Sequence, residues 1–345
     1  MEDNNKVDNI LESPGTEDYK SLHDYIDGWY KYQQGIITAE MVDRQFDVRS
    51  RTGKQNRWII LERLVKKGAL HKTGRGYRVV DSNLDHIPWP DAQGGSIPFN
   101  WPKGRDDTGF SFDGEIEIYP KDIIVISGVS NTGKSGFALN TLIENMDEYH
   151  VRLMGNELDA RKFAHRLRYF DWVDLFNGDS PKFEAIRRYE NHQDIILPDA
   201  LNIIDWLNLG DNFWQVGKII EGIQSKLTTG ICVIVLQKSE GKALGRGGDF
   251  SRDLASVYFS IDKDLLTVVK VKSYKHKNPN GKQFHFSLEH GGSKFMDIYE
   301  VKMCRACGGK KVRYVKGGTV DCDSCGGTGY QRVEPKPEYG EGLPF

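Results

Sequence analysis

The run "GVSNTGKS", residues 128–135, constrains the fold of this 345-residue chain more than any other feature. It follows the apolar run "DIIVI" and precedes "GFALNTLI", so we expect a buried strand before it and a helix after it. Glycine, four residues, glycine, lysine and serine in that setting form a loop whose backbone N–H groups surround phosphates. The predicted nucleotide contacts come from Gly128, Val129, Ser130, Asn131, Thr132, Gly133, Lys134, Ser135 and Gly136.

Side chains at three places predict how ATP and Mg²⁺ are held. Lys134 is expected to reach the β and γ phosphates, and the hydroxyl of Ser135 is expected to hold Mg²⁺. Asp205 ends the apolar strand "LNIID" and has the form of a carboxylate that supports Mg²⁺ through water or Ser135. ATP and Mg²⁺ are therefore the predicted ligands.

Two more polar residues stand where apolar strands end. Glu157 follows the strand-like run "HVRLM", and Gln237 ends "ICVIVLQ". Because the carboxyl ends of parallel strands form the ligand side of an open α/β sheet, both side chains are expected near the phosphates. Glu157 there would orient or deprotonate the attacking water. A surface carboxylate without a catalytic role is the alternative for Glu157.

The stretch 110–300 alternates strand-like and helix-like runs, which predicts an α/β fold. Early alternation indicates a mostly parallel sheet with flanking helices, and the last strands indicate an antiparallel extension. Cys232 lies in an apolar run and is expected to be a buried strand residue.

Residues 19–81 have the pattern of helices followed by a small hairpin, with Thr38 capping a short helix and Gly68 ending a longer one. Trp58, Leu61, Leu64 and Val65 are expected on one face of the longer helix. This segment resembles a winged helix-turn-helix, which implies DNA binding by the start of the longer helix and by the hairpin. The residues so implied are Arg49, Arg51, Lys54, Arg57, Lys72, Arg75 and Arg78. A winged helix used for protein contacts is the alternative.

The charge of the same segment also favours DNA as its partner. Residues 20–80 carry 13 Lys and Arg against 6 Asp and Glu, a balance that suits a polyanion such as single- or double-stranded DNA. A solvated charged face is the alternative. Residues 1–18 are acidic and expected to be disordered, and the Pro-, Gly- and Asp-rich stretch 82–109 is expected to be a linker. No apolar stretch is long enough to span a bilayer, and we expect a cytoplasmic protein.

Four cysteines in residues 301–330 stand in two close pairs, "CRAC" and "CDSC". Four thiolates at this spacing predict a closed structural zinc site rather than a catalytic one. The segment resembles a zinc ribbon or the cysteine repeats of DnaJ chaperones. The predicted ligands are Cys304, Cys307, Cys322 and Cys325. The tail 331–345 ends in Leu-Pro-Phe and resembles the tip of bacterial single-stranded-DNA-binding proteins, which implies docking of a replication partner; a plain solvated tail is the alternative.

Residues 110–300 resemble the RecA-type ATPase core, in the branch of the DnaB-like replicative helicases of phages and plasmids. The resemblance is carried by "GVSNTGKS", "NELDARKFAHRL", "NIIDWLNL", "VIVLQ" and "KHKNPNG" in that order. It implies that Glu157 is the catalytic base and that Gln237 senses the γ-phosphate. It also implies that Lys275 and Lys277 act in the neighbouring subunit's site; solubilising edge lysines are the alternative.

The same resemblance implies a hexameric ring or a filament, with a cationic DNA-binding loop at 238–252 that includes Lys242, Arg246 and Arg252. A disordered surface loop is the alternative there. The expected function is a DNA-dependent ATPase motor, a phage- or plasmid-type replicative helicase. The late turn carries lysines where such helicases carry an arginine, so a RecA- or RadA-like recombination ATPase stays open. A winged-helix regulator switched by ATP, with negligible turnover, is the alternative of another class.

Overall fold

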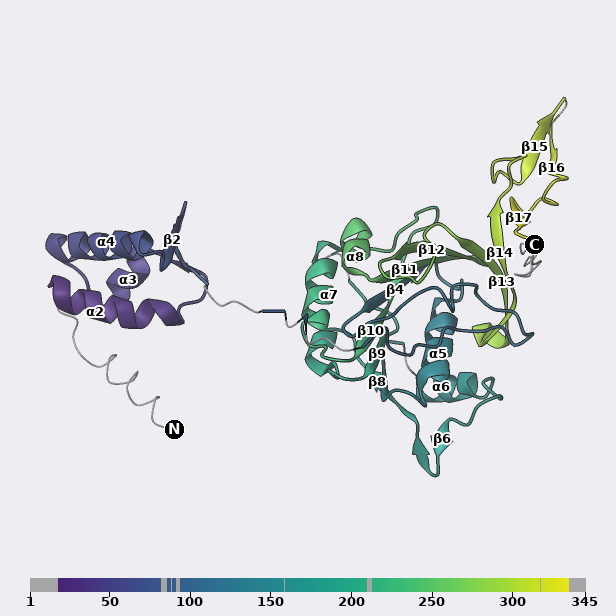
Figure 1. Ribbon diagram of the computed structural model, residues 1–345, viewed down its shortest axis with the longest axis horizontal. Helices are drawn as coiled ribbons and strands as arrows, with labels where there is room; N and C mark the ends of the chain where they lie inside the picture. The colour runs from purple at the N-terminus through teal and green to yellow at the C-terminus, as the bar shows by residue number, and fades with distance from the viewer. Residues whose placement is uncertain are drawn as a thin grey trace, which may run out of the picture. The chain divides into compact units, whose positions relative to one another are not determined.

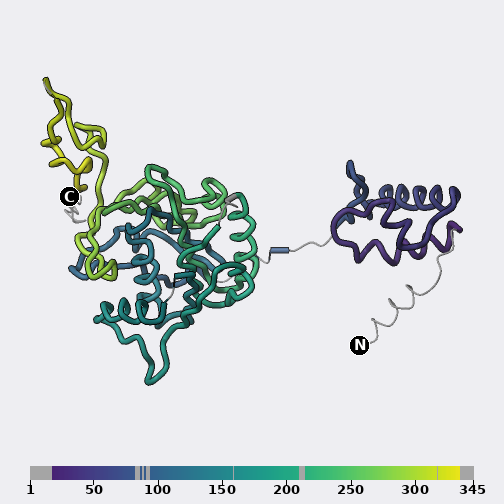
Figure 2. The backbone as a smooth tube through the Cα atoms, turned by 180° about the vertical axis from the view of Figure 1, so that it is seen from behind, coloured from purple at the N-terminus to yellow at the C-terminus, as the bar shows by residue number. Residues whose placement is uncertain are grey.

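The computed structural model describes residues 18–81, 86–87, 89–90, 94–157, 159–209, 213–316 and 318–334. The chain divides into a small unit, Met1–Ala92, and a large unit, Gln93–Phe345 (Figures 1 and 2). The expected acidic tail, apart from Asp18, and the Leu-Pro-Phe tip lie outside the described residues.

In its described residues, the small unit contains three α-helices, a short 3-10 helix (Tyr30–Tyr32) and a three-stranded sheet. The helices are α2 (Tyr19–Trp29), α3 (Ala39–Gln45) and α4 (Arg51–Lys66), and the strands are β1 (Ile36–Ile37), β2 (Leu70–Thr73) and β3 (Gly76–Val79), in the order β1-β3-β2. The side chains of Thr38 and Ser50 accept hydrogen bonds at the starts of α3 and α4. Ile60, Leu61 and Leu64 of α4 are buried, whereas Trp58 is 54% exposed. Our expectation that Trp58 shares the buried face was wrong, because the buried face is centred near Leu64 and Trp58 lies about 120° from it round the helix.

A ten-stranded sheet forms the large unit, in the order β17-β14-β13-β12-β11-β4-β10-β9-β5-β8. The six strands from β11 to β8 are parallel, and the four from β12 to β17 are antiparallel. This arrangement confirms the predicted α/β class, a mostly parallel sheet with flanking helices and an antiparallel extension. The strands are β4 (Ile123–Gly128), β5 (Val151–Gly155), β8 (Phe183–Arg187), β9 (Leu201–Ile204), β10 (Ile231–Gln237), β11 (Val257–Asp262), β12 (Leu265–Val271), β13 (Gln283–Glu289), β14 (Lys294–Met303) and β17 (Tyr330–Arg332).

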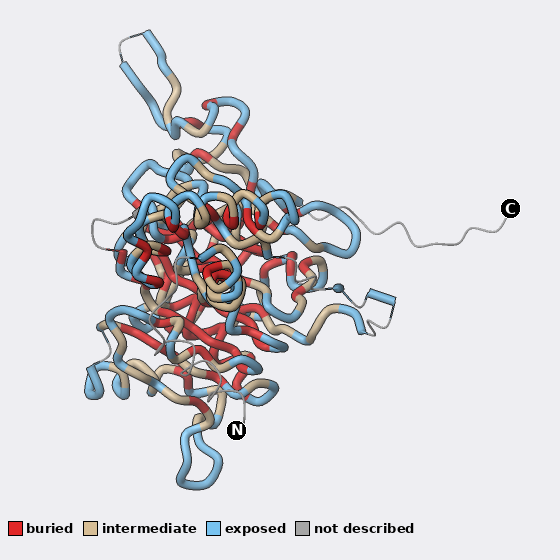
Figure 3. The backbone as a smooth tube through the Cα atoms, turned by 90° about the vertical axis from the view of Figure 1, so that its left-hand side faces the viewer, coloured by how far each residue is buried: buried red, intermediate tan, exposed pale blue. Residues whose placement is uncertain are grey.

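Helices cover both faces of this sheet (Figure 1). They are α5 (Lys134–Asn145), α6 (Ala160–Leu167), α7 (Val216–Gln224) and α8 (Gly248–Leu254). Apolar side chains of α5 pack with one core cluster, and those of α7 pack with a second cluster on the other face. The central parallel strands are almost wholly buried, as the red segments of Figure 3 show, and Cys232 of β10 is fully buried.

The segment that follows the small unit is not a linker along its whole length. Trp101 is 1% exposed and packs with the rings of Phe99, Phe112 and Phe259 in the core of the large unit. Its main chain is also joined to the sheet, since Arg105 donates to the carbonyl of Phe295. Our linker prediction for 82–109 was therefore wrong from residue 94 onward, because the apolar residues between the prolines and glycines outweigh the turn-forming composition.

Cysteines 304–325 lie between two strands of the same sheet. β14 leads directly into the first cysteine pair, and β17 returns from the second pair to lie antiparallel beside β14. A hairpin of β15 (Val312–Val315) and β16 (Gly318–Asp321) projects between the pairs, and a second small hairpin, β6 (Phe176–Asn177) with β7 (Ser180–Pro181), follows α6. We call residues 304–329 the cysteine ribbon. Among the described residues, none of the helices is long and apolar enough to cross a membrane.

Candidate active site

The loop between β4 and α5 is held in the shape that phosphate binding needs. Asn131 and Gly133 have positive φ angles of 59° and 101°, which turn successive N–H groups toward the same side. Gly136 lies in the first turn of α5, where an added Cβ would stand 2.2 Å from the carbonyl oxygen of Gly292. The hydroxyl of Thr132 donates to the carbonyl of Val129 at 2.9 Å. The motif thus sits between strand β4 and helix α5, as the sequence predicts.

Ser135 and Asp205 are brought together across the loop. The Ser135 hydroxyl donates to Oδ1 of Asp205 at 3.0 Å, although 70 residues separate them in sequence. Burial raises the pKa of Asp205, while the hydrogen bond from Ser135 and the charges of Arg166 and Lys134 act in the opposite direction. A hydroxyl beside a carboxylate offers the hard oxygen donors that Mg²⁺ prefers, so these two residues fit the predicted ion.

Lys134 is buried beside the same carboxylates. Its ammonium donates to the carbonyl of Val129, and only 7% of the residue is exposed. Burial lowers its pKa, Asp205 and Glu157 raise it, and the nearby Lys238 lowers it further. The nearby carboxylates offset only part of the cost of burying the Lys134 ammonium. A buried cation of this kind attracts an anion strongly, as a phosphate site requires.

Glu157 lies at the same edge of the sheet as Lys134 and Asp205. It follows β5, and Nε1 of Trp206 lies 3.4 Å from its carboxylate. Trp206 comes directly after Asp205, through a cis peptide bond. Glu157 is exposed, so its carboxylate can meet both solvent water and a phosphate bound at the loop. The structure therefore assembles the sequence-predicted acids and lysine into one cluster.

Gln237 joins this cluster to the loop that follows β10. Its side-chain amide donates to the hydroxyl of Ser130 at 2.6 Å, and its carbonyl accepts a hydrogen bond from the backbone of Arg246 at 2.7 Å. Gln237 therefore contacts both the phosphate loop and residue 246 of the following loop. Lys238, the first residue of the predicted cationic loop 238–252, is instead buried and pairs with Asp262 at 2.7 Å and Ser260 at 2.8 Å.

Arg166 of α6 is a member of the cluster that sequence reasoning missed. Burial lowers its pKa, and the charge of the nearby Asp205 acts in the opposite direction. Its Nε atom is buried without a hydrogen-bond partner among the described residues. The signal was present in "DARKFAHRL", where Arg166 falls nine residues after Glu157 on the helix that enters from the same edge. Basic residues in that run gave no reason to select it.

Lys275 and Lys277 lie outside the cluster. Both are exposed, on the turn after β12, and their backbone N–H groups donate to the carbonyl and carboxylate of Glu115 at 2.8 and 3.3 Å. Within the described part of the chain, neither ammonium makes a hydrogen bond or an ion pair. Glu115 thus holds the turn, and both lysine side chains are left toward solvent.

The loop predicted to bind DNA is partly helical. Its second half forms α8, in which Arg252 pairs with Asp249 at 2.9 Å and Asp253 at 3.3 Å. Lys242 and Arg246 are both exposed. Of the three predicted contacts, Lys242 and Arg246 lie on the irregular part, before the helix begins.

The predicted DNA contacts of the small unit divide into two groups. Arg51, Lys54 and Arg75 are exposed at the start of α4 and the tip of the hairpin. Several others have partners within the unit: Arg57 pairs with Asp43 and donates to the carbonyl of Ala39, Lys72 pairs with Glu62, Arg49 with Asp47, and Arg78 donates to the carbonyl of Val79. Arg57 is more than four-fifths buried, so it stabilises the packing of α3 on α4 rather than offering a free charge.

The four cysteine sulfurs meet at one point. All lie within 4.8 Å of one another, with Cys304–Cys322 at 3.9 Å and Cys307–Cys325 at 3.8 Å. Tetrahedral zinc with Zn–S bonds of about 2.3 Å requires S–S separations of about 3.8 Å, so the geometry fits this ion. Positive φ at Gly308, Gly309, Gly326 and Gly327 turns the backbone around the sulfurs, and the Gly329 N–H donates to Cys325 Sγ at 3.3 Å. Four close thiolates leave no open position for a substrate.

Comparison with known proteins adds one finding. No family model matches the chain, and no curated protein matches it. A solved structure of a KaiC-like protein from the hyperthermophilic archaeon Pyrococcus horikoshii OT3 is similar, with 14% identity and a TM-score of 0.40 over 59% of this chain and 100% of that one. Because this likeness is weak, the fold is described from the strand order of this chain alone.

Proposed function

We propose that the chain is a DNA-dependent ATPase motor of RecA/DnaB type, a phage- or plasmid-type replicative helicase that couples ATP hydrolysis to translocation on single-stranded DNA. The observation that carries the proposal is the convergence of Lys134, Ser135–Asp205 and Glu157 at one edge of the sheet. Residues that follow the carboxyl ends of β4, β5 and β9 meet there, although more than 70 positions separate the first from the last.

Each member of the cluster has a task in hydrolysis. Lys134 binds the β and γ phosphates, and Ser135 with Asp205 holds Mg²⁺, which neutralises charge on the phosphates when bound. Glu157 orients and deprotonates the attacking water, since it is exposed and lies beside the lysine without pairing to it. Arg166 supports the cluster by opposing the charge of Asp205.

Coupling to DNA runs through Gln237. Its side chain contacts Ser130 of the phosphate loop and its backbone contacts Arg246 of the following loop. Loss of the γ-phosphate changes the surroundings of Ser130, and Gln237 passes that change to residues 238–252. Lys242 and Arg246 then bind or release the phosphate backbone of the single-stranded DNA.

Assembly and DNA capture complete the proposal. Lys275 and Lys277 are exposed on a turn held by Glu115, as cations that reach a neighbouring copy's phosphates would be. The small unit offers DNA the exposed Arg51, Lys54 and Arg75. A zinc ion at the four cysteines stabilises the cysteine ribbon, and the Leu-Pro-Phe tip docks a replication protein.

The test is steady-state ATP hydrolysis by the full-length protein with and without single-stranded DNA. We expect DNA to stimulate the wild type, Lys134→Ala to be inactive in both conditions, and Gln237→Ala to keep basal hydrolysis but lose stimulation. Equal rates of ATP hydrolysis by the wild type with and without single-stranded DNA would contradict the proposed motor. Negligible hydrolysis by a protein that still binds ATP would favour the ATP-switched winged-helix regulator.

A RecA- or RadA-like recombination ATPase is the second candidate, favoured by lysines rather than arginine at 275 and 277. Unwinding of a forked duplex supports the helicase, whereas strand exchange without unwinding supports the recombinase. Mass measurement with ATP distinguishes a hexamer from a filament.

A further inference from the structure

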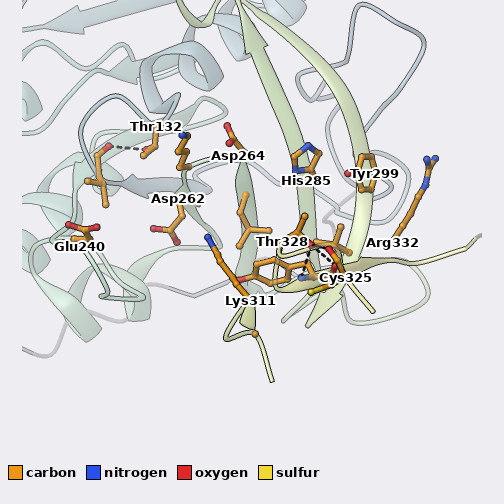
Figure 4. Close-up of a pocket in the computed structure, with 16 residues that line it drawn as sticks. Thr132, Glu240, Asp262, Asp264, His285, Tyr299, Lys311, Cys325, Thr328 and Arg332 are labelled. Carbon is orange, nitrogen blue, oxygen red and sulfur yellow. Dashed lines mark hydrogen bonds between the residues drawn. The ribbon is translucent and has the colours of Figure 1, made fainter. Parts of the chain in front are cut away.

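A cavity of about 790 Å³ lies between the phosphate loop and the cysteine ribbon (Figure 4). Val129 and Thr132 of the phosphate loop line one end, and Thr328 and Tyr330 line the other. Pockets that hold small ligands and cofactors have volumes of roughly 300–1,000 Å³. The cavity thus has the size of a ligand site and opens directly onto the phosphate-binding loop.

The wall made by the ribbon is attached firmly to the sheet. β14 and β17 pair through residues 301–303 and 330–332, and the N–H of Cys304 donates to the carbonyl of Gly329 at 2.8 Å. An added Cβ on Gly329 would stand 2.9 Å from the carbonyl oxygen of Gly309, so the two cysteine pairs pack closely. Segments with four thiolates at this spacing are folded only when the thiolates bind a metal. The structure of the cysteine ribbon, and so of this wall, therefore depends on the metal.

The lining offers hydrogen-bond acceptors to a sugar. Glu240, Asp262 and Asp264 place carboxylates along the phosphate-loop side, as Figure 4 shows, while Asp262 is paired with Lys238, and Lys263 and Lys311 line the same cavity. Carboxylates accept hydrogen bonds from hydroxyl groups, which ribose supplies.

The other side is aromatic. His285 and Tyr299 have ring centroids 4.8 Å apart, and the Arg332 guanidinium lies 4.7 Å from the Tyr299 ring. Tyr330 of the returning strand adds a further ring to this side. Flat π surfaces beside a cation are suited to a planar heterocycle.

We propose that this cavity holds the base and ribose of the nucleotide whose phosphates are bound at residues 128–135, and that the cysteine ribbon is its outer wall. Zinc at Cys304, Cys307, Cys322 and Cys325 then controls nucleotide affinity, beyond stabilising the ribbon. The inference rests on the proposed nucleotide site and adds to it a part that binds the base and ribose and depends on zinc.

Calorimetric binding of Mg-ADP and of Mg-pyrophosphate to the full-length protein tests the proposal. Pyrophosphate reports the phosphate loop alone, whereas ADP reports the loop and the cavity. We expect Tyr330→Ala to weaken ADP binding about tenfold and to leave pyrophosphate binding unchanged, since one stacking partner is lost. Zinc removal by a chelator should produce the same selective loss. Tyr314→Ala is the matched control, because Tyr314 is 78% exposed on β15 and outside the cavity.

Zinc content is measured for every variant, so that loss of the ribbon is distinguished from loss of one ring. If Tyr330→Ala releases zinc, Arg332→Ala takes its place, since Arg332 is exposed and its removal should disturb the fold least. Unchanged ADP affinity in the zinc-free protein and the variant would overturn the inference and leave the proposed function standing. A parallel loss of pyrophosphate binding would also overturn it. Absence of ADP binding by the wild type would overturn both.

Discussion

Replacing Glu157 by glutamine separates catalysis from binding in this site. Glutamine keeps the size of the side chain and removes only its charge and its capacity to take a proton. General-base catalysis contributes about 10²–10⁴-fold to a rate, so we expect DNA-stimulated turnover to fall by that factor, equivalent to about 3–5 kcal/mol in the activation free energy.

Binding and stability should change little. The contact of Glu157 with Trp206 is long, at 3.4 Å, and the side chain is exposed, so its loss should cost about 0.5 kcal/mol or less. That corresponds to a fall in melting temperature of about 2 °C or less for a unit of this size. Mg-ATP affinity should stay within about threefold or rise slightly, because a negative charge near the phosphates is removed.

The assay is single-turnover and steady-state hydrolysis beside nucleotide binding and thermal unfolding. Glu148→Gln is the matched control, since Glu148 is exposed beyond the other end of α5. Normal hydrolysis by Glu157→Gln would refute the catalytic assignment. Loss of nucleotide binding together with activity would show instead that Glu157 is a structural member of the site.

Two further predictions concern backbone packing and charge in the same cluster. Gly136→Ala should lower the free energy of unfolding by about 1–3 kcal/mol, because its Cβ would stand 2.2 Å from the carbonyl oxygen of Gly292, whereas Gly114→Ala, with nothing within 4 Å, should be near neutral in chemical denaturation. Asp205→Asn should stabilise the magnesium-free protein at about pH 7, because the raised pKa of Asp205 means that its ionisation in the folded state costs folding free energy. This gain in stability should shrink as the pH falls toward the ordinary aspartate pKa of about 4. Equal stabilisation at both pH values would contradict the prediction.

Part of the site could be predicted from sequence because its members are marked by local patterns. The phosphate loop carries its own signature between an apolar strand and a helix, and Asp205 and Gln237 stand at the ends of apolar runs. The four cysteines are marked by spacing alone. Strand ends are informative because parallel topology brings them to one edge whatever the sequence between them.

Other features depended on contacts between distant segments. Arg166 belongs to a helix rich in basic residues, and only its approach to Asp205 distinguishes it from its neighbours. Lys238 follows Gln237 in a run that reads as an exposed cationic loop, yet it is buried because Asp262 and Ser260 of β11 lie within its reach. Trp101 sits among prolines and glycines and is buried because the core of the large unit offers it aromatic partners.

The sequence by itself determined the α/β class, the nucleotide loop and the cysteine cluster, since each depends on periodicity or spacing over a few residues. Only the tertiary structure decided that the cysteine ribbon stands beside the phosphate loop and encloses a cavity with it. The physical reason is that β14 and β17 extend the same sheet that carries the loop, and pairing between strands far apart in sequence leaves no local pattern.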